Sequence, residues 1–189
     1  ILRKHVIPKD PKTPKQLAYR MRFGMVNKSL SPLNRVIKKG FLNTDNAYRK
    51  AVSKALNNAV IGEYPEYKLD YSKIQVAEGK LQLPTFVSVN VDSNTKLATV
   101  NWNPEPIFDN YPGREDDRVN IVCLNESTPE AVCFHNSAKR SKGTATIDLS
   151  SKMVINKLWS IKDLHFWLYL STYDITQNSD SIYIKCTEK

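Results

Sequence analysis

Residues 11–41 read PKTPKQLAYRMRFGMVNKSLSPLNRVIKKGF, and this stretch decides how the chain begins to fold. Thr13 is a residue type that accepts hydrogen bonds from the free amides of a first helical turn, and Pro14 suits the first helical position because it has no amide hydrogen to satisfy. Gln16 stands where a side chain can reach back to the cap backbone and complete a capping box. The pattern predicts a helix over residues 13–29.

A second helix start follows within the same stretch. Ser31 suits the N-cap and Pro32 the first helical position, and apolar residues then recur at helical spacing, so we expect a second helix over residues 31–41. A third helix is expected over residues 45–60, with Gly62 as its C-cap. The chain therefore begins with a module of three short helices.

The first helix has an apolar face and the whole module has a strong positive charge. Leu17, Met21 and Met25 recur at four-residue steps, which predicts that this face is buried. Residues 1–60 hold fourteen Lys and Arg against two acidic residues, whereas residues 61–189 hold fourteen against seventeen. Such asymmetry is typical of a surface that binds a polyanion or an acidic protein, and the alternative is a solvated face that only maintains solubility.

The candidate binding residues are the basic side chains of this module, with two tyrosines that could stack on bases or rings. The basic candidates are Lys9, Lys12, Lys15, Arg20, Arg22, Lys28, Arg35, Lys38, Lys39, Arg49, Lys50 and Lys54. The stacking candidates are Tyr19 and Tyr48. No catalytic residue, metal ligand or cofactor is predicted.

The second half of the chain has an all-β pattern. Alternating or strongly β-forming segments are separated by turn signals, which predicts seven short strands. These strands are expected at residues 86–91, 97–102, 118–124, 130–135, 143–149, 164–172 and 181–185. Seven strands in this length indicate an antiparallel β-sandwich of the immunoglobulin or fibronectin type III kind, with Trp102 near a strand end as a core residue. The expected fold class is therefore α+β.

Three segments are expected along the chain. Residues 1–62 would form a basic arm and the helical module, residues 63–83 a connector with a strand at 73–77, and residues 84–189 the sandwich. The sequence has no apolar run long enough to span a bilayer. Because it begins with Ile1 rather than Met, we expect residues before this position to have been removed or left out.

Three cysteines cannot all pair within one chain. Cys123 and Cys133 lie on neighbouring strands of a predicted hairpin, where the expected register pairs Cys133 with Ile121, so the two thiols are not opposed. We expect Cys123, Cys133 and Cys186 to be free thiols. Their small number weakly disfavours a disulfide-stabilised secreted module.

Several motifs together resemble a known family. They are PKTPKQLAxRxxF at residues 11–23, LSPL at 30–33, GF at 40–41, AVxGxYP at 59–65 and DYSK at 70–73. The sequence resembles an uncharacterised family of Bacteroidetes proteins, domain of unknown function 6266. The resemblance implies a further glycine-rich segment at the start, and nearly all of that segment is missing from this sequence. The family has no established activity, so the resemblance implies an architecture and no chemistry.

The sequence contains few signs of catalysis. The histidines are His5, His135 and His165, and none belongs to a nucleophile motif. Cys133 and His135 share one face of a predicted strand and could contribute to a metal site, but the matching second pair of ligands is missing. The loop at residues 109–117 carries four carboxylates and could bind calcium, although it does not match an EF-hand. Phosphate-binding glycine loops are absent.

We therefore expect a non-catalytic binding or structural assembly protein, a component of a surface layer, filament or virion-like particle. Its basic helical face would dock an acidic partner, and its sandwich would contact other proteins or further copies of the chain. The alternative is a non-specific nucleic-acid-binding protein that uses residues 9–54. Sequence-specific DNA binding, membrane-surface binding and glycan hydrolysis have weaker support. We expect no small-molecule substrate, and a bacterial cell surface, extracellular or virion location rather than the cytoplasm.

Overall fold

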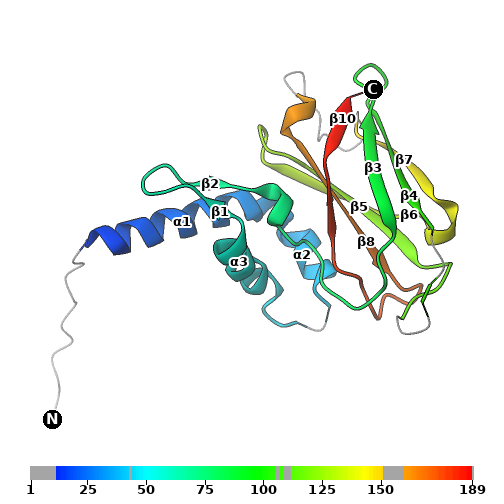
Figure 1. Cartoon of the computed structure of the whole chain (residues 1–189), viewed down its shortest axis with the longest axis horizontal. Coiled ribbons are helices and arrows are strands. Elements are labelled where there is room, and N and C mark those ends of the chain that lie inside the picture. Colours follow the sequence, from blue (N-terminus) through cyan, green and yellow to red (C-terminus); the bar gives the residue numbers. More distant parts are fainter. Residues whose placement is uncertain (1–11, 43, 105–106, 109–111, 151–159, 189) are drawn as a thin grey trace, which may run out of the picture.

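The computed structural model describes residues 12–42, 44–104, 107–108, 112–150 and 160–188. It has a group of N-terminal helices beside two four-stranded sheets (Figure 1). The helices are α1 (Pro14–Leu30), α2 (Asn34–Gly40) and α3 (Ala47–Asn58), with short 3-10 turns η1 (Ser31–Leu33), η2 (Tyr71–Lys73), η3 (Arg140–Lys142) and η5 (Ile161–Asp163). The fold class is α+β, as predicted.

The start of α1 is the predicted capping box. The Thr13 hydroxyl accepts a hydrogen bond from the Gln16 amide at 3.3 Å, and the Gln16 side chain accepts one from the Thr13 amide at 3.2 Å. The second predicted cap is wrong. Ser31 is not an N-cap, because the chain continues from α1 through η1 into α2 with no side-chain cap.

The predicted role of Gly62 is also wrong. Helix α3 ends at Asn58, and the chain then forms a two-stranded hairpin of β1 (Val60–Ile61) and β2 (Lys68–Leu69). Gly62 lies in the turn of this hairpin with a φ of 85°, where a Cβ atom would stand 2.6 Å from the Glu66 carbonyl oxygen. Glycine is needed there for the hairpin and not for a helix end.

The two large sheets contain all seven predicted strands. The first sheet has the order β10-β3-β4-β7 and the second the order β6-β5-β8-β9. Their bounds are β3 (Thr85–Val91), β4 (Leu97–Asn103), β5 (Arg118–Asn125), β6 (Glu130–Lys139), β7 (Thr144–Asp148), β8 (Leu164–Ser171), β9 (Ile182–Ile184) and β10 (Cys186–Glu188). All neighbours are antiparallel except β10 and β3, which pair in parallel. Strand β10 is an addition to the prediction.

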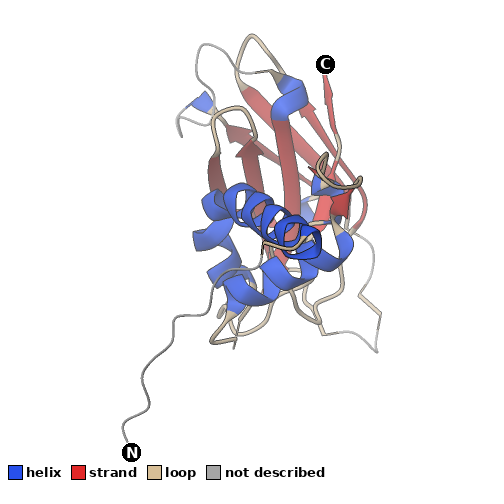
Figure 2. Cartoon of the chain, turned by 90° about the vertical axis from the view of Figure 1, so that its left-hand side faces the viewer, coloured by secondary structure: helices blue, strands red, loops and turns tan. Residues whose placement is uncertain are grey.

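The second sheet lies between two hydrophobic clusters. Strand β8 shows the division: Phe166 and Leu168 pack in the cluster between the sheets, whereas Trp167 and Tyr169 pack in the cluster beneath the helices. Successive side chains of a strand point to opposite faces, so a strand covered on both faces is apolar throughout. The molecule therefore has three layers, with the helices covering the outer face of the second sheet (Figure 2).

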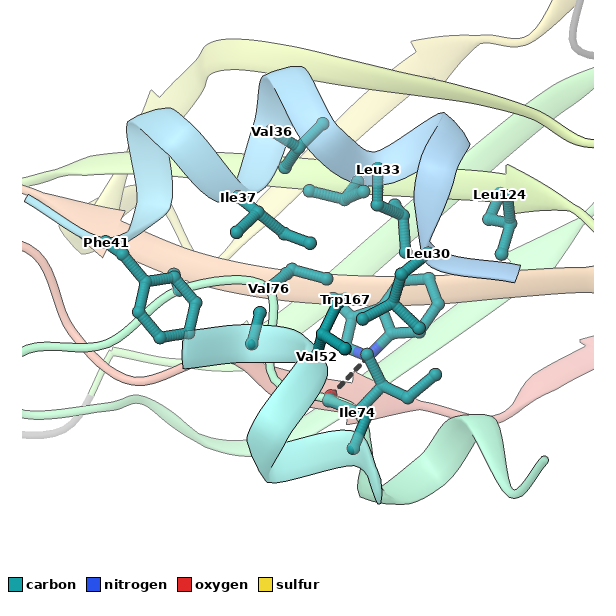
Figure 3. Packing of buried hydrophobic residues seen from close by; sticks show 14 of the residues in the cluster. Leu30, Leu33, Val36, Ile37, Phe41, Val52, Ile74, Val76, Leu124 and Trp167 are labelled. Atoms are coloured by element: carbon teal, nitrogen blue, oxygen red, sulfur yellow. Dashed lines mark hydrogen bonds between the residues drawn. The ribbon is translucent and has the colours of Figure 1, made fainter. Parts of the chain in front are cut away.

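An irregular segment joins the helices to this sheet. Residues 73–77 were expected to form a strand, but the prediction is wrong because their backbone groups bond to side chains. The Trp167 indole nitrogen donates to the Ile74 carbonyl oxygen at 3.0 Å, and the Val76 amide donates to the Ser181 hydroxyl at 2.9 Å. Figure 3 shows Ile74 and Val76 between the helices and Trp167.

The predicted buried face of α1 is wrong for its first half. Leu17 and Met21 are 38% and 45% exposed, whereas Val26 and Leu30 are fully buried. The reason is the position of the helix: only its second half reaches the sheet, and the first half extends beyond the body of the molecule (Figure 1). Periodicity identified the helix but not which part of it would find a packing partner.

Two other predictions about the core can be compared directly. Trp102 is buried between the sheets as expected, and its indole nitrogen donates to the Arg140 carbonyl oxygen at 2.7 Å. The cysteines are free, but the expected hairpin register is wrong by one residue, because Cys133 faces Val122.

The division into three segments stays a prediction. None of the helices in the described part of the chain combines the length and apolar character that a bilayer crossing requires.

Candidate partner-binding surface

Most of the predicted basic residues lie on the solvent side of the helical layer or beside it. Lys9 lies outside the described residues. Nine others have exposed side chains. One of these, Lys50, pairs with Glu78. We call the remaining eight the basic helical surface: Lys12, Lys15, Arg20, Lys28, Arg35, Lys38, Lys39 and Arg49. Asp45 is the only acidic residue in the sequence from position 12 to position 60. The helical layer therefore presents a surface with a large excess of positive charge.

Two predicted residues, Lys50 and Lys54, have a structural role. Their ammonium groups lie 2.9 and 3.1 Å from the two carboxylate oxygens of Glu78, and Lys54 also donates to the Gln75 side chain at 2.8 Å. Burial by itself raises the pKa of Glu78, but the hydrogen bonds from both lysines outweigh it and the pKa lies below its ordinary value. These lysines hold α3 against the segment that follows η2 and contribute less charge to a partner.

The aromatic and arginine candidates differ in accessibility. Tyr48 donates its hydroxyl to the Asn27 carbonyl oxygen at 3.2 Å, and burial raises its pKa. Tyr19 is 54% exposed and stacks on Phe23 with a centroid distance of 6.4 Å. The half-buried Arg22 places its guanidinium 5.8 Å from the centre of the Tyr67 ring. Of the two stacking candidates, Tyr19 is the one that presents its ring to solvent.

Lys38 and Lys39 also border a pocket between the end of α2 and the outer face of the second sheet. The pocket has a volume of about 490 Å³, and Arg118 and His135 line it from β5 and β6. Sequence reasoning missed both as binding residues: Arg118 was the first residue of a predicted strand, and His135 was assigned to a strand end. Their proximity to Lys39 depends on how α2 packs on the sheet, for which the sequence carries no local signal.

His135 and Cys133 lie side by side, as the strand alternation indicated. Cys133 Sγ is 3.4 Å from His135 Nδ1, and Lys39 Nζ is 3.5 Å from His135 Nε2. Burial raises the pKa of Cys133 to about 12, so its thiol is not activated as a nucleophile. Burial and then the Lys39 charge lower the pKa of His135. This pair is therefore suited to hydrogen bonding rather than to thiolate chemistry.

The acidic loop lies partly outside the described residues, which omit positions 109–111. In the described part, Glu115 and Asp116 are exposed and Asp117 is buried. Asp117 accepts a hydrogen bond from the Arg114 amide at 2.8 Å, and burial raises its pKa. Across the described residues, no three His, Cys, Asp or Glu side chains are grouped to hold a metal ion. The described part of the loop therefore gives the calcium alternative no support.

Comparison with known proteins identifies a family. The sequence model of a family of unknown function, DUF6266, matches residues 2–185. No curated protein matches the chain.

Proposed function

The chain belongs to the DUF6266 family, and we propose that it is a non-catalytic binding or assembly protein whose basic helical surface docks an acidic partner protein. The observation that carries the proposal is the charge of the helical layer. The basic helical surface has eight exposed basic side chains, and the sequence from position 12 to position 60 contains one acidic residue, Asp45. A charge excess of one sign steers and orients a partner of the opposite sign.

The first half of α1 adds apolar contacts to this surface. Leu17, Tyr19, Met21 and Phe23 are between 38% and 54% exposed on a helix that extends beyond the body of the molecule. Interfaces combine exposed aromatic and Met side chains at their centre with charged residues at their rim. The combination supports a protein partner over a simple polyanion, and it is also compatible with self-assembly in a surface layer, filament or virion-like particle.

We also infer a fibronectin type III-like identity for the sandwich. The strand order β10-β3-β4-β7 in one sheet and β6-β5-β8-β9 in the other supports it. Without the short edge strand β10, seven strands are divided between two packed sheets, as in this class of sandwich. Domains of this architecture are commonly protein-binding modules, although this is an analogy at the level of fold.

The test measures binding of poly-L-glutamate, as a model acidic chain, by fluorescence anisotropy. A variant with Lys15→Glu, Lys28→Glu and Arg35→Glu should bind at least about tenfold more weakly than the unaltered protein, since each lost surface charge contact contributes several tenths of a kcal/mol. A matched variant with Lys142→Glu, Lys162→Glu and Lys185→Glu has the same change in net charge on the sandwich. Equal weakening in both variants would contradict the assignment to the helices.

The second candidate function is non-specific nucleic-acid binding by residues 9–54. The same charge excess favours it, together with the exposed Tyr19 ring. Gel-shift titrations against single- and double-stranded DNA at several salt concentrations distinguish the two. Contact with about six phosphates gives a slope of about −5 for log affinity against log salt, and such a slope would favour this candidate over the acidic protein. Light scattering on the same sample tests self-assembly, which a strictly monomeric full-length protein would contradict.

A further inference from the structure

The pocket beside Lys39 has a charge and a shape that suggest a ligand. Lys38 and Lys39 line it from α2 and Arg118 from β5, and its walls include the apolar groups of Leu42 and Ile175. No acidic side chain is among the described residues that line it. Its volume of about 490 Å³ lies in the range of small-molecule sites, which are mostly apolar with a few convergent polar groups.

A chain of buried hydrogen bonds fixes the floor of this pocket. Asn120 donates to the Ser171 hydroxyl at 2.9 Å, and Ser171 donates to the Asn178 side chain at 2.7 Å. Asn178 then donates to the backbone carbonyls of Lys39 and Gly40 at 3.0 and 2.8 Å. Because these three polar side chains are at least 94% buried, they hold β5, β8 and the end of α2 in one arrangement.

The same network orients His135 toward Lys39. The Asn120 side-chain oxygen accepts from the Asn136 amide at 3.2 Å and lies 3.4 Å from His135 Nδ1. A protonated lysine can only donate, so His135 Nε2 accepts from Lys39 and the ring proton belongs on Nδ1, facing Asn120. Lys39 is thus held at the pocket by a neutral ring nitrogen rather than by a carboxylate, and its charge remains available to an anion.

The rim of the pocket contains two residues with unusual backbone conformations. Asn136 and Ile175 have φ values of 52° and 58°, in the left-handed region. This conformation is rare for a β-branched residue such as isoleucine, and Ile175 is also 57% exposed. Strained backbone of this kind clusters at ligand sites, where the surrounding structure maintains it.

We propose that this pocket binds an organic monocarboxylate, with its carboxylate between Lys39 and Arg118 and its apolar body against Leu42, Tyr169 and Ile175. Arg118 can meet the two oxygens of a planar carboxylate with paired N–H groups while its face stacks on Tyr173, whose ring centre is 4.4 Å from the guanidinium carbon. The proposal does not rest on the acidic partner, although Lys38 and Lys39 belong both to this pocket and to the basic helical surface. It adds a small-molecule ligand to a protein for which the sequence predicted no small-molecule substrate.

The experiment titrates the full chain with 4-phenylbutyrate and follows the amide signals by ¹H–¹⁵N NMR. Shift changes should centre on Asn120, Asn136 and Ser171, and Lys39→Met should weaken binding about tenfold, the effect of one charged hydrogen bond. Lys28→Met is the matched control, because Lys28 is an equally charged, exposed lysine on α1 and should change the affinity less than about twofold.

The uncharged analogue 4-phenyl-1-butanol tests the role of the carboxylate, and acetate tests the role of the apolar body. Both should bind much more weakly than 4-phenylbutyrate. Absence of binding by 4-phenylbutyrate at millimolar concentration would overturn the proposal. Equal binding of the alcohol, equal weakening by Lys28→Met, or shift changes away from the pocket would also overturn it.

Discussion

Trp167→Phe tests the contact that joins the helical layer to the sheets. The Trp167 side chain is fully buried, and its indole nitrogen is 3.0 Å from the Ile74 carbonyl oxygen (Figure 3). Phenylalanine keeps an apolar ring but leaves this carbonyl without its donor, at a cost of about 1–3 kcal/mol. The smaller ring also leaves about 40 Å³ unfilled, which costs about 1 kcal/mol at about 24 cal/mol per Å³. We therefore expect the unfolding free energy to fall by about 2–4 kcal/mol.

The measurement is urea denaturation followed by far-ultraviolet circular dichroism. Trp102→Phe is the matched control, since Trp102 also loses a hydrogen bond from its indole, to Arg140, but in the cluster between the two sheets. Hydrogen exchange should locate the two effects differently. Amides of α2 and α3 should exchange faster in Trp167→Phe, and amides of β4 and β7 in Trp102→Phe.

Two results would refute this reasoning. A loss of stability below about 1 kcal/mol in Trp167→Phe would mean that the indole hydrogen bond contributes little, or that water replaces it. Faster exchange in the first sheet rather than in the helices would mean that Trp167 does not couple the helical layer to the sandwich.

Three further predictions follow from the packing and the charges. Gly40→Ala places a Cβ atom in collision with the Val76 carbonyl oxygen, so we expect a loss of at least about 2 kcal/mol, measured by thermal unfolding. Burial lowers the pKa of His165, although the nearby Glu126 carboxylate acts in the opposite direction. As the pH falls, the His165 imidazole is therefore protonated at a higher pH in the unfolded chain than in the folded one. The unfolding free energy should be greatest above about pH 6.5 and fall as the pH approaches the folded pKa, and the urea midpoints at pH 7 and pH 5 should differ less in His165→Gln. Glu78→Gln removes a partner of two lysines; because that side chain is 33% exposed, stability should fall by less than about 1 kcal/mol, while poly-L-glutamate affinity should rise.

Local features of the fold followed closely from the sequence. The capping box at Thr13 and Gln16 depends on residues three positions apart, so its geometry is encoded by its neighbours. The same applies to the seven strands, whose limits are set by turn residues and by alternation. Their predicted positions agree with β3 to β9 within a few residues.

Features that depend on contacts between residues far apart in the chain could not be predicted from the sequence. The segment at residues 73–77 has the alternation of a strand, but Trp167 and Ser181 take its backbone hydrogen bonds. Leu17 and Met21 have the spacing of a buried helix face, but both are exposed. Hydrophobic periodicity does not determine how much of a helix packs on a sheet. The hairpin register of Cys133 was wrong by one residue because a turn can be closed in more than one way.

The same distinction between local and long-range information applies to the candidate binding surface. Composition alone located the positive charge on the first sixty residues, since charge is a property of the chain and not of its fold. Only the tertiary structure decided that Lys50 and Lys54 face Glu78, and that Lys39, Arg118 and His135 meet at one pocket. These last three come from α2, β5 and β6, and the packing energy that brings them together is carried by the apolar residues beneath the helices. The sequence by itself therefore determined the helices, the seven sandwich strands and the basic character of the first sixty residues. Long-range packing determined the irregular segment at 73–77, the added strand β10 and which charges remain available to a partner.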